Sequence, residues 1–313
     1  MHNDYNKTPK KKQEGKLSSA SSKKLRTLKL SKSFDSNKLM ARAERVRLCG
    51  TMLHIKRCEN GHEFLHRANF CRDRLCPMCA ERRSQKYFAE INELLHVAAQ
   101  RFKMRYIFLT LTVRNMPGSE LSDTLTQMFK GFNDMVRLKD VDKNLIGWIR
   151  NLEVTVDKES YHPHFHCILA VRPSYFKDGY ISQKRWTELW QGCAKLDYTP
   201  IVHVQSVKPK KRESGIESAI AETSKYTVKD TDYIKTSEKE TDSIVGILAY
   251  ALHSRRLIGF GKEFRKIRAE FKHNQSNLNE PGVCDENCPI CNSTLKDLFY
   301  KWQFNVAQYV QVK

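Results

Sequence analysis

The chain has 313 residues, enough for about two domains, and hydrophobic residues make up 40% of it, so a folded core is available. Its 55 Lys and Arg residues exceed its 35 Asp and Glu residues by 20, which predicts a polyanionic partner, with nucleic acid first. The longest strongly apolar stretch, 106–113, is about half of the ~18–20 residues that a membrane-spanning helix needs. No apolar signal segment follows the basic N-terminus. We therefore expect a cytoplasmic protein.

Residues 1–45 carry 13 Lys and Arg residues against four Asp and Glu residues and show no hydrophobic periodicity. This composition predicts a disordered basic tail. Such a tail is either a solvated segment with no binding role or a segment that binds the DNA backbone non-specifically. A short helix over about 39–48 is expected to follow it.

The ten cysteines fall mainly into two clusters, and their two-residue gaps favour thiolate metal sites over disulfides in a cytoplasmic chain. Structural zinc takes four Cys or His ligands. The first cluster predicts a zinc-binding element over residues 46–86, and buried thiols without a metal are the alternative. Its preferred ligands are Cys58, Cys71, Cys76 and Cys79, with His62 as a substitute and Cys49 less favoured.

The second cluster, Cys284, Cys288 and Cys291, has no obvious fourth ligand, although His273 is a candidate, so a second zinc site stays open. Basic side chains flank the first cluster, and we expect them to contact DNA, a solvated helix face being the alternative. These side chains are Arg72, Arg74, Arg82, Arg83 and Lys86.

Hydrophobic spacing predicts the elements that follow. In chain order they are a helix over 80–102, a strand over 106–113, a helix over 119–138, strands over 146–156 and 164–171 joined by a hairpin-like link, a helix over 183–196, a strand over 200–207, and helices over 216–229 and 244–257. This pattern indicates an α+β fold with a mainly antiparallel central sheet and helices packed on it. The amphipathic stretch at 295–312 is expected to pack on the main domain or to form a protein contact.

The sequence HPHFHCILAV (162–171) is the sharpest local signal. In a strand, residues two apart share a face, so His164 and His166 converge on one point and suit a divalent cation. Glu153, in the neighbouring strand, is the obvious carboxylate ligand, because an unpaired buried carboxylate there is unfavourable. His162 is expected to support these ligands or to contact DNA. Solvent-facing histidines, or histidines paired with phosphate, are the alternatives.

In AIAETSKYTVKD (219–230), Glu222 and Tyr226 are four residues apart, which places them on one face of the predicted helix. Lys225 and Lys229 lie on an adjacent strip and are candidate DNA contacts. Tyrosine is a weak nucleophile at its usual pKa near ~10, so it needs a nearby cation, which the metal site could supply. Tyr233 could share this face only if the helix continued.

Three motifs, in this order, resemble those of the HUH endonuclease superfamily, and specifically the rolling-circle replication initiators of small bacterial plasmids. They are FLTLTVRN (108–115), HPHFHCILAV (162–171) and ETSKYTVKD (222–230). The resemblance implies that Tyr226 nicks one strand at the double-strand origin and stays joined to the 5′-phosphate. It also implies that Glu222 activates water for the terminating cleavage, and that strands are rejoined at termination.

The resemblance covers roughly residues 45–262. Together with the composition and the cysteine spacing it predicts four parts: a disordered basic tail over 1–45, a zinc-binding element over 46–86, an HUH endonuclease domain over 87–262 and a C-terminal extension over 263–313 with a possible second cysteine cluster. The implied cofactors are Mg2+ or Mn2+ for nicking and structural Zn2+. The implied partners are origin DNA, single-stranded DNA and a host helicase and polymerase. A relaxase or single-strand transposase of the same superfamily, or a non-catalytic zinc-containing DNA-binding repressor, are the alternatives.

Overall fold

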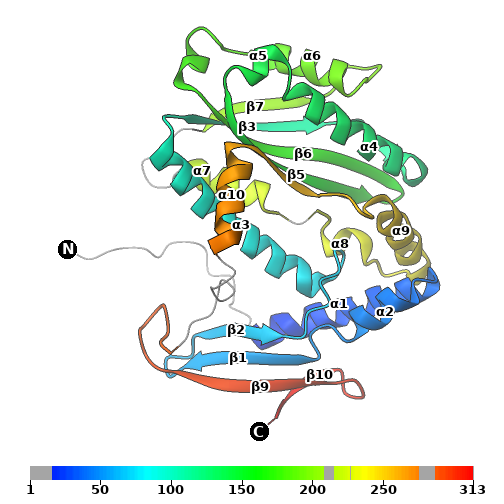
Figure 1. Cartoon of the computed structure of the whole chain (residues 1–313). Coiled ribbons are helices and arrows are strands. Elements are labelled where there is room, and N and C mark those ends of the chain that lie inside the picture. The colour runs from blue at the N-terminus through cyan, green and yellow to red at the C-terminus, as the bar shows by residue number, and fades with distance from the viewer. Residues whose placement is uncertain (1–15, 208–214, 226, 275–285, 313) are drawn as a thin grey trace.

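The computed structural model of the chain describes residues 16–207, 215–225, 227–274 and 286–312. Two antiparallel sheets organise it, and Figure 1 shows the six-stranded sheet above the four-stranded one. The larger sheet has the strand order β7 (Val202–Val207), β3 (Arg105–Thr112), β6 (Ser160–Val171), β5 (Leu145–Asp157) and β8 (Ile258–Lys262), and β4 (Met116–Pro117) pairs with β6. The predicted α+β class with an antiparallel central sheet is confirmed.

Alternation along the strands decides which helices cover each face of the larger sheet. Phe165, Cys167 and Leu169 of β6 point to one face and pack with residues of α4 (Gly118–Met135), α6 (Gln183–Cys193) and α9 (Glu238–Ala251). Ile168 and Ala170 point to the other face and pack with α3 (Pro77–Arg101), α7 (Gly215–Thr223) and α10 (Glu263–Asn274). The sheet is therefore the middle layer between two sets of helices (Figure 1).

The smaller sheet joins segments from both ends of the chain. Its strand order is β10 (Gln308–Val312), β9 (Leu295–Gln303), β1 (Met52–Cys58) and β2 (Glu63–Ala68). The main core continues into it through Leu53, Ile55 and Trp302. Helices α1 (Lys16–Ser36) and α2 (Met40–Arg47) pack together beside it. The short elements α5 (Lys139–Asp142), η1 (Pro173–Phe176) and α8 (Asp230–Tyr233) complete the described fold.

Helix α1 corrects the prediction of a disordered tail for residues 16–36. Four of its six buried residues are polar, which is why no hydrophobic periodicity marks it. Thr27 and Ser31 are buried beside Leu30 and Phe34, and their hydroxyl groups donate to the backbone oxygens of Lys23 and Ala43. Burial of these two hydroxyl groups is tolerated because each is hydrogen-bonded. Residues 1–15 of the predicted tail lie outside the described part.

Helix α7 ends at Thr223, so the prediction of one helix over 216–229 is wrong, and with it the shared helical face of Glu222 and position 226. The helices predicted over 80–102, 119–138 and 183–196 correspond to α3, α4 and α6. The helix predicted over 244–257 is α9, which begins six residues earlier, where the Ser237 hydroxyl caps it by accepting from the backbone N–H of Glu240.

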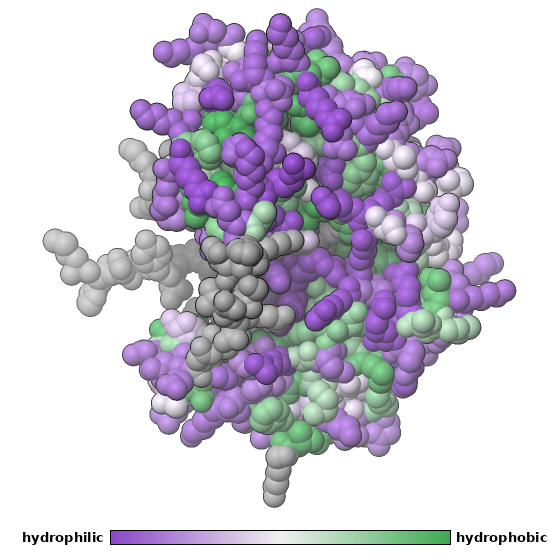
Figure 2. Space-filling model, viewed as in Figure 1, coloured by the Kyte–Doolittle hydropathy of each residue, from purple (hydrophilic) through white to green (hydrophobic). Residues whose placement is uncertain are grey.

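The face of the molecule in Figure 2 is mostly hydrophilic, with smaller hydrophobic groups, one at the lower end where Figure 1 places the four-stranded sheet. Partly exposed hydrophobic side chains there include Phe299 and Val310 of β9 and β10. Among the described residues, none of the helices is both long enough and apolar enough to cross a lipid bilayer.

Candidate metal centre and nucleic-acid pocket

Glu153, His164 and His166 lie together on one face of the larger sheet. Antiparallel pairing sets this arrangement, because Glu153 of β5 lies directly opposite His164 of β6. Oε2 of Glu153 is 3.1 Å from Nε2 of His166 and 3.5 Å from Nε2 of His164. The three side chains are only 10–13% exposed. The structure therefore brings together the three residues that the sequence predicts as a metal site.

The second nitrogen of each imidazole has its own partner. Nδ1 of His164 is 3.3 Å from the carbonyl oxygen of His162, which can only accept, so this Nδ1 carries the hydrogen. Nδ1 of His166 is 3.4 Å from the Thr110 hydroxyl of β3. Partners of this kind orient each ring so that its Nε2 faces Glu153, and Nε2 is the atom that would bind a metal. Two Nε2 atoms and a carboxylate oxygen then face one point, which fits a divalent cation.

The surroundings favour the charged form of Glu153. Burial alone would raise the pKa of its carboxyl, but the hydrogen bonds from His164 and His166 outweigh burial and lower the pKa well below its usual range. Phe108 stacks on His166, with 5.7 Å between ring centroids. His162 lies next along the same strand face, and burial lowers its pKa. Its predicted role in supporting the metal ligands or DNA stays a prediction.

The segment after α7 runs beside this centre. The side-chain amide of Asn151 donates to the carbonyl oxygen of Lys225 at 3.0 Å, and the backbone N–H of Val154 donates to the carbonyl oxygen of Thr227 at 2.7 Å. Asn151 is two residues from Glu153 and so points to the same sheet face. Both neighbours of position 226 are therefore anchored to β5 on either side of Glu153, while Tyr226 itself lies outside the described residues.

Glu222 lies at the end of α7, 37% exposed, and its carboxylate pairs with the Lys225 ammonium at 2.5 Å. Tyr233 is fully buried in α8, and its hydroxyl donates to the carbonyl oxygen of Leu75. Burial raises the pKa of Tyr233 well above its usual value. A buried, hydrogen-bonded and neutral phenol is not available as a nucleophile, which removes Tyr233 as an alternative to Tyr226.

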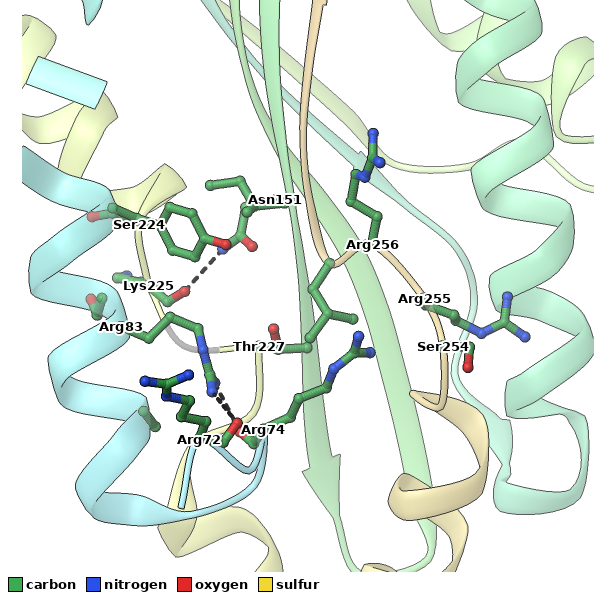
Figure 3. A pocket seen from close by; sticks show the side chains of 15 residues that line it. Arg72, Arg74, Arg83, Asn151, Ser224, Lys225, Thr227, Ser254, Arg255 and Arg256 are labelled. Carbon is green, nitrogen blue, oxygen red and sulfur yellow. Dashed lines mark hydrogen bonds between the residues drawn. The ribbon is translucent and has the colours of Figure 1, made fainter. Parts of the chain in front are cut away.

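A basic pocket of about 450 Å³ opens next to this segment, between the start of α3 and the sheet. Figure 3 shows the side chains of Arg72, Arg74 and Arg83 gathered near Lys225. The Arg83 guanidinium donates to the carbonyl oxygens of Arg72 at 3.2 Å and Arg74 at 3.3 Å, which holds the loop that carries them. Clustered cations in a concave site suit the phosphates of a nucleic acid.

The pocket takes in part of the predicted DNA-contacting set. Arg72, Arg74, Arg83 and Lys225 line it, whereas Arg82, Lys86 and Lys229 are not among its lining residues. Two further residues, Arg255 and Arg256, line the pocket but were not predicted from the sequence. The pair of arginines after α9 is a basic signal that could have indicated a DNA contact. Arg255 is directed toward α4 (Figure 3), where it donates to the carbonyl oxygen of Ser122 at 2.7 Å.

The first cysteine cluster consists of Cys49, Cys71, Cys76 and Cys79, whose Sγ atoms all lie within 4.8 Å of one another. The structure thus corrects the predicted set, because Cys49 takes the place given to Cys58. Backbone N–H groups donate to these sulfurs, for example from Arg72 to Cys79 at 3.3 Å, a pattern that suits thiolates. The cluster could hold zinc, and its loop carries Arg72 and Arg74 into the basic pocket.

Lys24 of α1 lies against this cluster, fully buried, and its ammonium donates to the carbonyl oxygen of Cys49 at 2.6 Å. Burial lowers the pKa of Lys24 to about 8, although the nearby Cys49 and Cys76 sulfurs act in the opposite direction. Four thiolates around a divalent cation carry net negative charge, so a buried ammonium beside them is favourable.

The remaining predicted ligands form a separate group. Cys58 and His62 lie with Cys288 and Cys291, and their ligand atoms are also within 4.8 Å of one another. Cys284 and the side chain of His273 lie outside what the structure describes. The cysteines in the described ranges are free thiols rather than disulfides, which agrees with the predicted use of thiolates as ligands.

Comparison with known proteins gives one family. The family model described as replication protein (Rep_1) matches residues 62–310. The curated relatives include a "Protein rep" of Streptococcus pneumoniae, 42% identical over 72% of this chain and 70% of the relative. Others from Bacillus amyloliquefaciens and Lactiplantibacillus plantarum are each 37% identical over 86% of this chain and over 84% and 87% of the relative, respectively. No solved structure gives a significant match.

Proposed function

This chain belongs to the replication protein family, and from this premise we propose that it initiates rolling-circle replication of a plasmid by nicking one DNA strand at the double-strand origin. The observation that carries the proposal is the Glu153, His164 and His166 centre, which lies on the same sheet face as the segment around position 226 and next to a basic pocket. A nicking enzyme needs these three parts together: metal ligands, a nucleophile and cations for phosphates.

Tyr226 supplies the nucleophile in this proposal. Its hydroxyl oxygen attacks the phosphorus of the scissile phosphodiester and the bond from phosphorus to O3′ breaks, while the phenolic proton passes to solvent and solvent returns a proton to the leaving O3′. The products are a 5′-phosphotyrosine and a free 3′-hydroxyl that primes synthesis. A Mg2+ or Mn2+ ion held by Glu153, His164 and His166 would polarise the phosphate. The hydrogen bonds from β5 to Lys225 and Thr227 support a tyrosine beside these ligands.

Glu222 has the terminating role in this proposal. After one round of synthesis its carboxylate takes a proton from the water that cleaves the regenerated origin, and the phosphotyrosine is then resolved by attack of the new 3′-hydroxyl. The half-exposed position of Glu222 at the end of α7 supports access to water. Its ion pair with Lys225 holds the carboxylate beside position 226 in the chain, where such a base would be needed.

The basic pocket binds the origin DNA backbone in this proposal, as single-stranded DNA, and a structural Zn2+ in the cluster of Cys49, Cys71, Cys76 and Cys79 holds its loop. Phosphate contacts of this kind supply affinity without sequence information, so recognition of the origin needs additional base or shape readout. A host helicase and polymerase then extend the free 3′-hydroxyl. In this proposal, replication is initiated in the cytoplasm.

The test incubates the full chain with labelled single-stranded DNA from its own plasmid origin and Mn2+. We expect cleavage of this DNA, and we expect EDTA to abolish it. The Tyr226→Phe variant should lose cleavage but retain DNA binding. The Tyr250→Phe variant is the control and should still cleave, because Tyr250 lies on α9, is 76% exposed and does not line the pocket. Cleavage by Tyr226→Phe at the wild-type rate would refute the assigned nucleophile. Tight binding with no cleavage under Mg2+ or Mn2+ would instead indicate a DNA-binding repressor.

A further inference from the structure

We propose that Cys58, His62, Cys288 and Cys291 form a second zinc site, which ties the β1–β2 turn to the segment that leads into β9. The site is separate from the proposed nicking centre, since none of its four residues lines the basic pocket. Nothing in the proposed function requires it, so the two proposals can fail independently.

The spacing of the ligand atoms fits tetrahedral zinc. With Zn–S near 2.3 Å and Zn–N near 2.0 Å, a tetrahedral site places sulfurs about 3.8 Å apart and a sulfur about 3.5 Å from a nitrogen. Sγ of Cys58 is 3.7 Å from Sγ of Cys291. Nδ1 of His62 is 3.3 Å from Sγ of Cys58 and 3.5 Å from Sγ of Cys288. A disulfide needs sulfurs about 2.05 Å apart, so this arrangement is not an oxidised pair.

The first ligand pair lies on a tight turn. The backbone N–H of Cys58 donates to the carbonyl oxygen of His62 at 3.1 Å, and the backbone N–H of His62 donates to Sγ of Cys58 at 3.3 Å. Gly61 makes the turn possible, because its φ of +80° is a conformation that other residues rarely adopt. The turn therefore directs a sulfur and an imidazole nitrogen to the same side.

The second ligand pair lies on a similar turn. The backbone N–H of Cys288 donates to the carbonyl oxygen of Ser293 at 2.8 Å, and that of Asn292 donates to the carbonyl oxygen of Cys288 at 2.7 Å. The Ser293 hydroxyl lies 3.0 Å from Sγ of Cys291, where it can donate to a thiolate. Two such turns, facing each other, supply two ligands each, as structural zinc sites do.

The proposed site fixes how β9 pairs with β1 in the four-stranded sheet. Cys58 and Cys291 are 233 positions apart in the chain, yet Cys58 pairs directly with Leu295 where β9 begins. A metal that bridges the two turns sets the register of β9 against β1 at its first residue. The chemistry of three thiolates and one imidazole selects Zn2+ over Mg2+ or Mn2+, which prefer oxygen ligands.

The test counts zinc by mass spectrometry in the full chain carrying His164→Ala and His166→Ala, so that the nicking centre adds none. We expect two zinc ions per chain, one for each Cys-containing ligand group, and one ion after Cys288→Ser with Cys291→Ser or after Cys71→Ser with Cys76→Ser. Cys193→Ser, a cysteine of α6 outside both groups, should keep two. A parent with a single zinc that survives Cys288→Ser with Cys291→Ser would overturn the proposal.

A ligand exchange keeps the test decisive if the serine variants do not fold. His62→Cys preserves four ligands, so the chain should still bind two metal ions, and Co2+ in place of zinc should show stronger sulfur-to-cobalt absorption than in the parent. An unchanged cobalt spectrum would mean that residue 62 is not a ligand and would contradict the assigned site.

Discussion

The six-stranded sheet places its candidate metal ligands by strand register, whereas the candidate ligands beside the four-stranded sheet come from turns and from both ends of the chain. Glu153 faces His164 because β5 and β6 form a continuous hairpin, and hydrophobic residues seal both faces of that sheet. Two groups of cysteine-containing candidate ligands lie beside the smaller sheet. We therefore expect substitution of a candidate ligand in the larger sheet to reduce DNA cleavage, and substitution of one beside the smaller sheet to reduce folding stability.

The largest expected effect is that of His164→Ala. Loss of one of three ligands should reduce metal-dependent DNA cleavage by about 10³-fold, because charge on the reacting phosphate is no longer offset. The thermal midpoint should change little, since His164 contributes to no hydrophobic core cluster. His96→Ala, an exposed histidine of α3, is the control and should cleave at the wild-type rate. Equal cleavage by His164→Ala would remove this sheet face from the mechanism.

The two cysteine groups should separate in the next comparison. Cys76→Ser should lower the thermal midpoint by about 10 °C, because a structural metal contributes folding free energy directly, and it should also weaken DNA binding through the loop of Arg72 and Arg74. Cys291→Ser should lower the midpoint while cleavage by the folded protein stays within about twofold. Calorimetry measures the thermal midpoint, and a cleavage assay measures the rate. If folded Cys291→Ser lost cleavage, the second cysteine group would be needed for activity, which would contradict this separation.

A smaller effect should follow from the arginines that border the pocket. Arg72→Ala should weaken binding of single-stranded DNA by about tenfold and reduce the slope of log K against log salt by about 0.7, as expected for one lost phosphate contact. Arg82→Ala removes the same charge from α3 outside the pocket and is the matched control. Fluorescence anisotropy at several salt concentrations measures both, and equal losses would indicate a diffuse charge effect.

The smallest expected effect concerns acid stability without bound metal. The pKa of Glu153 in the folded chain lies below its ordinary value of 4.5, so the ionised carboxylate stabilises the fold above pH 4.5. That contribution is lost as the pH falls from there through the lowered folded pKa. The free energy of unfolding should therefore fall more steeply below pH 4.5 in the parent than in Glu153→Gln. Parallel curves from urea titrations would show that the carboxylate does not contribute.

Four strands of the larger sheet, β3, β5, β6 and β7, were predicted because their signals are local, whereas the short strands β4 and β8 were not. The alternation in HPHFHCILAV and the short hairpin link set the face and the partner strand, and these place Glu153 beside the histidines. Helix α7 was extended too far because β5 competes for its backbone: the carbonyl oxygens of Lys225 and Thr227 bond to Asn151 and Val154 instead of continuing a helix.

The smaller sheet was harder to predict, because its partners are distant in sequence. Cys58 was assigned to the nearest cysteines, whereas the structure groups it with Cys288 and Cys291 through the pairing of β1 with β9. The stripe of α1 that packs on the first cluster contains Lys24 and Thr27, so no hydrophobic pattern marked it. The family indicated by the three motifs is confirmed at the level of replication proteins.

The most direct test of the account identifies the residue that carries DNA after cleavage. The chain is incubated with origin DNA and Mn2+, the covalent complex is isolated under denaturing conditions and digested, and the modified peptide is sequenced by mass spectrometry. We predict a 5′-phosphate ester on Tyr226 whose yield falls to background in His164→Ala. An ester on another residue, or a full yield without the histidine, would contradict a metal-assisted tyrosine centre on this sheet.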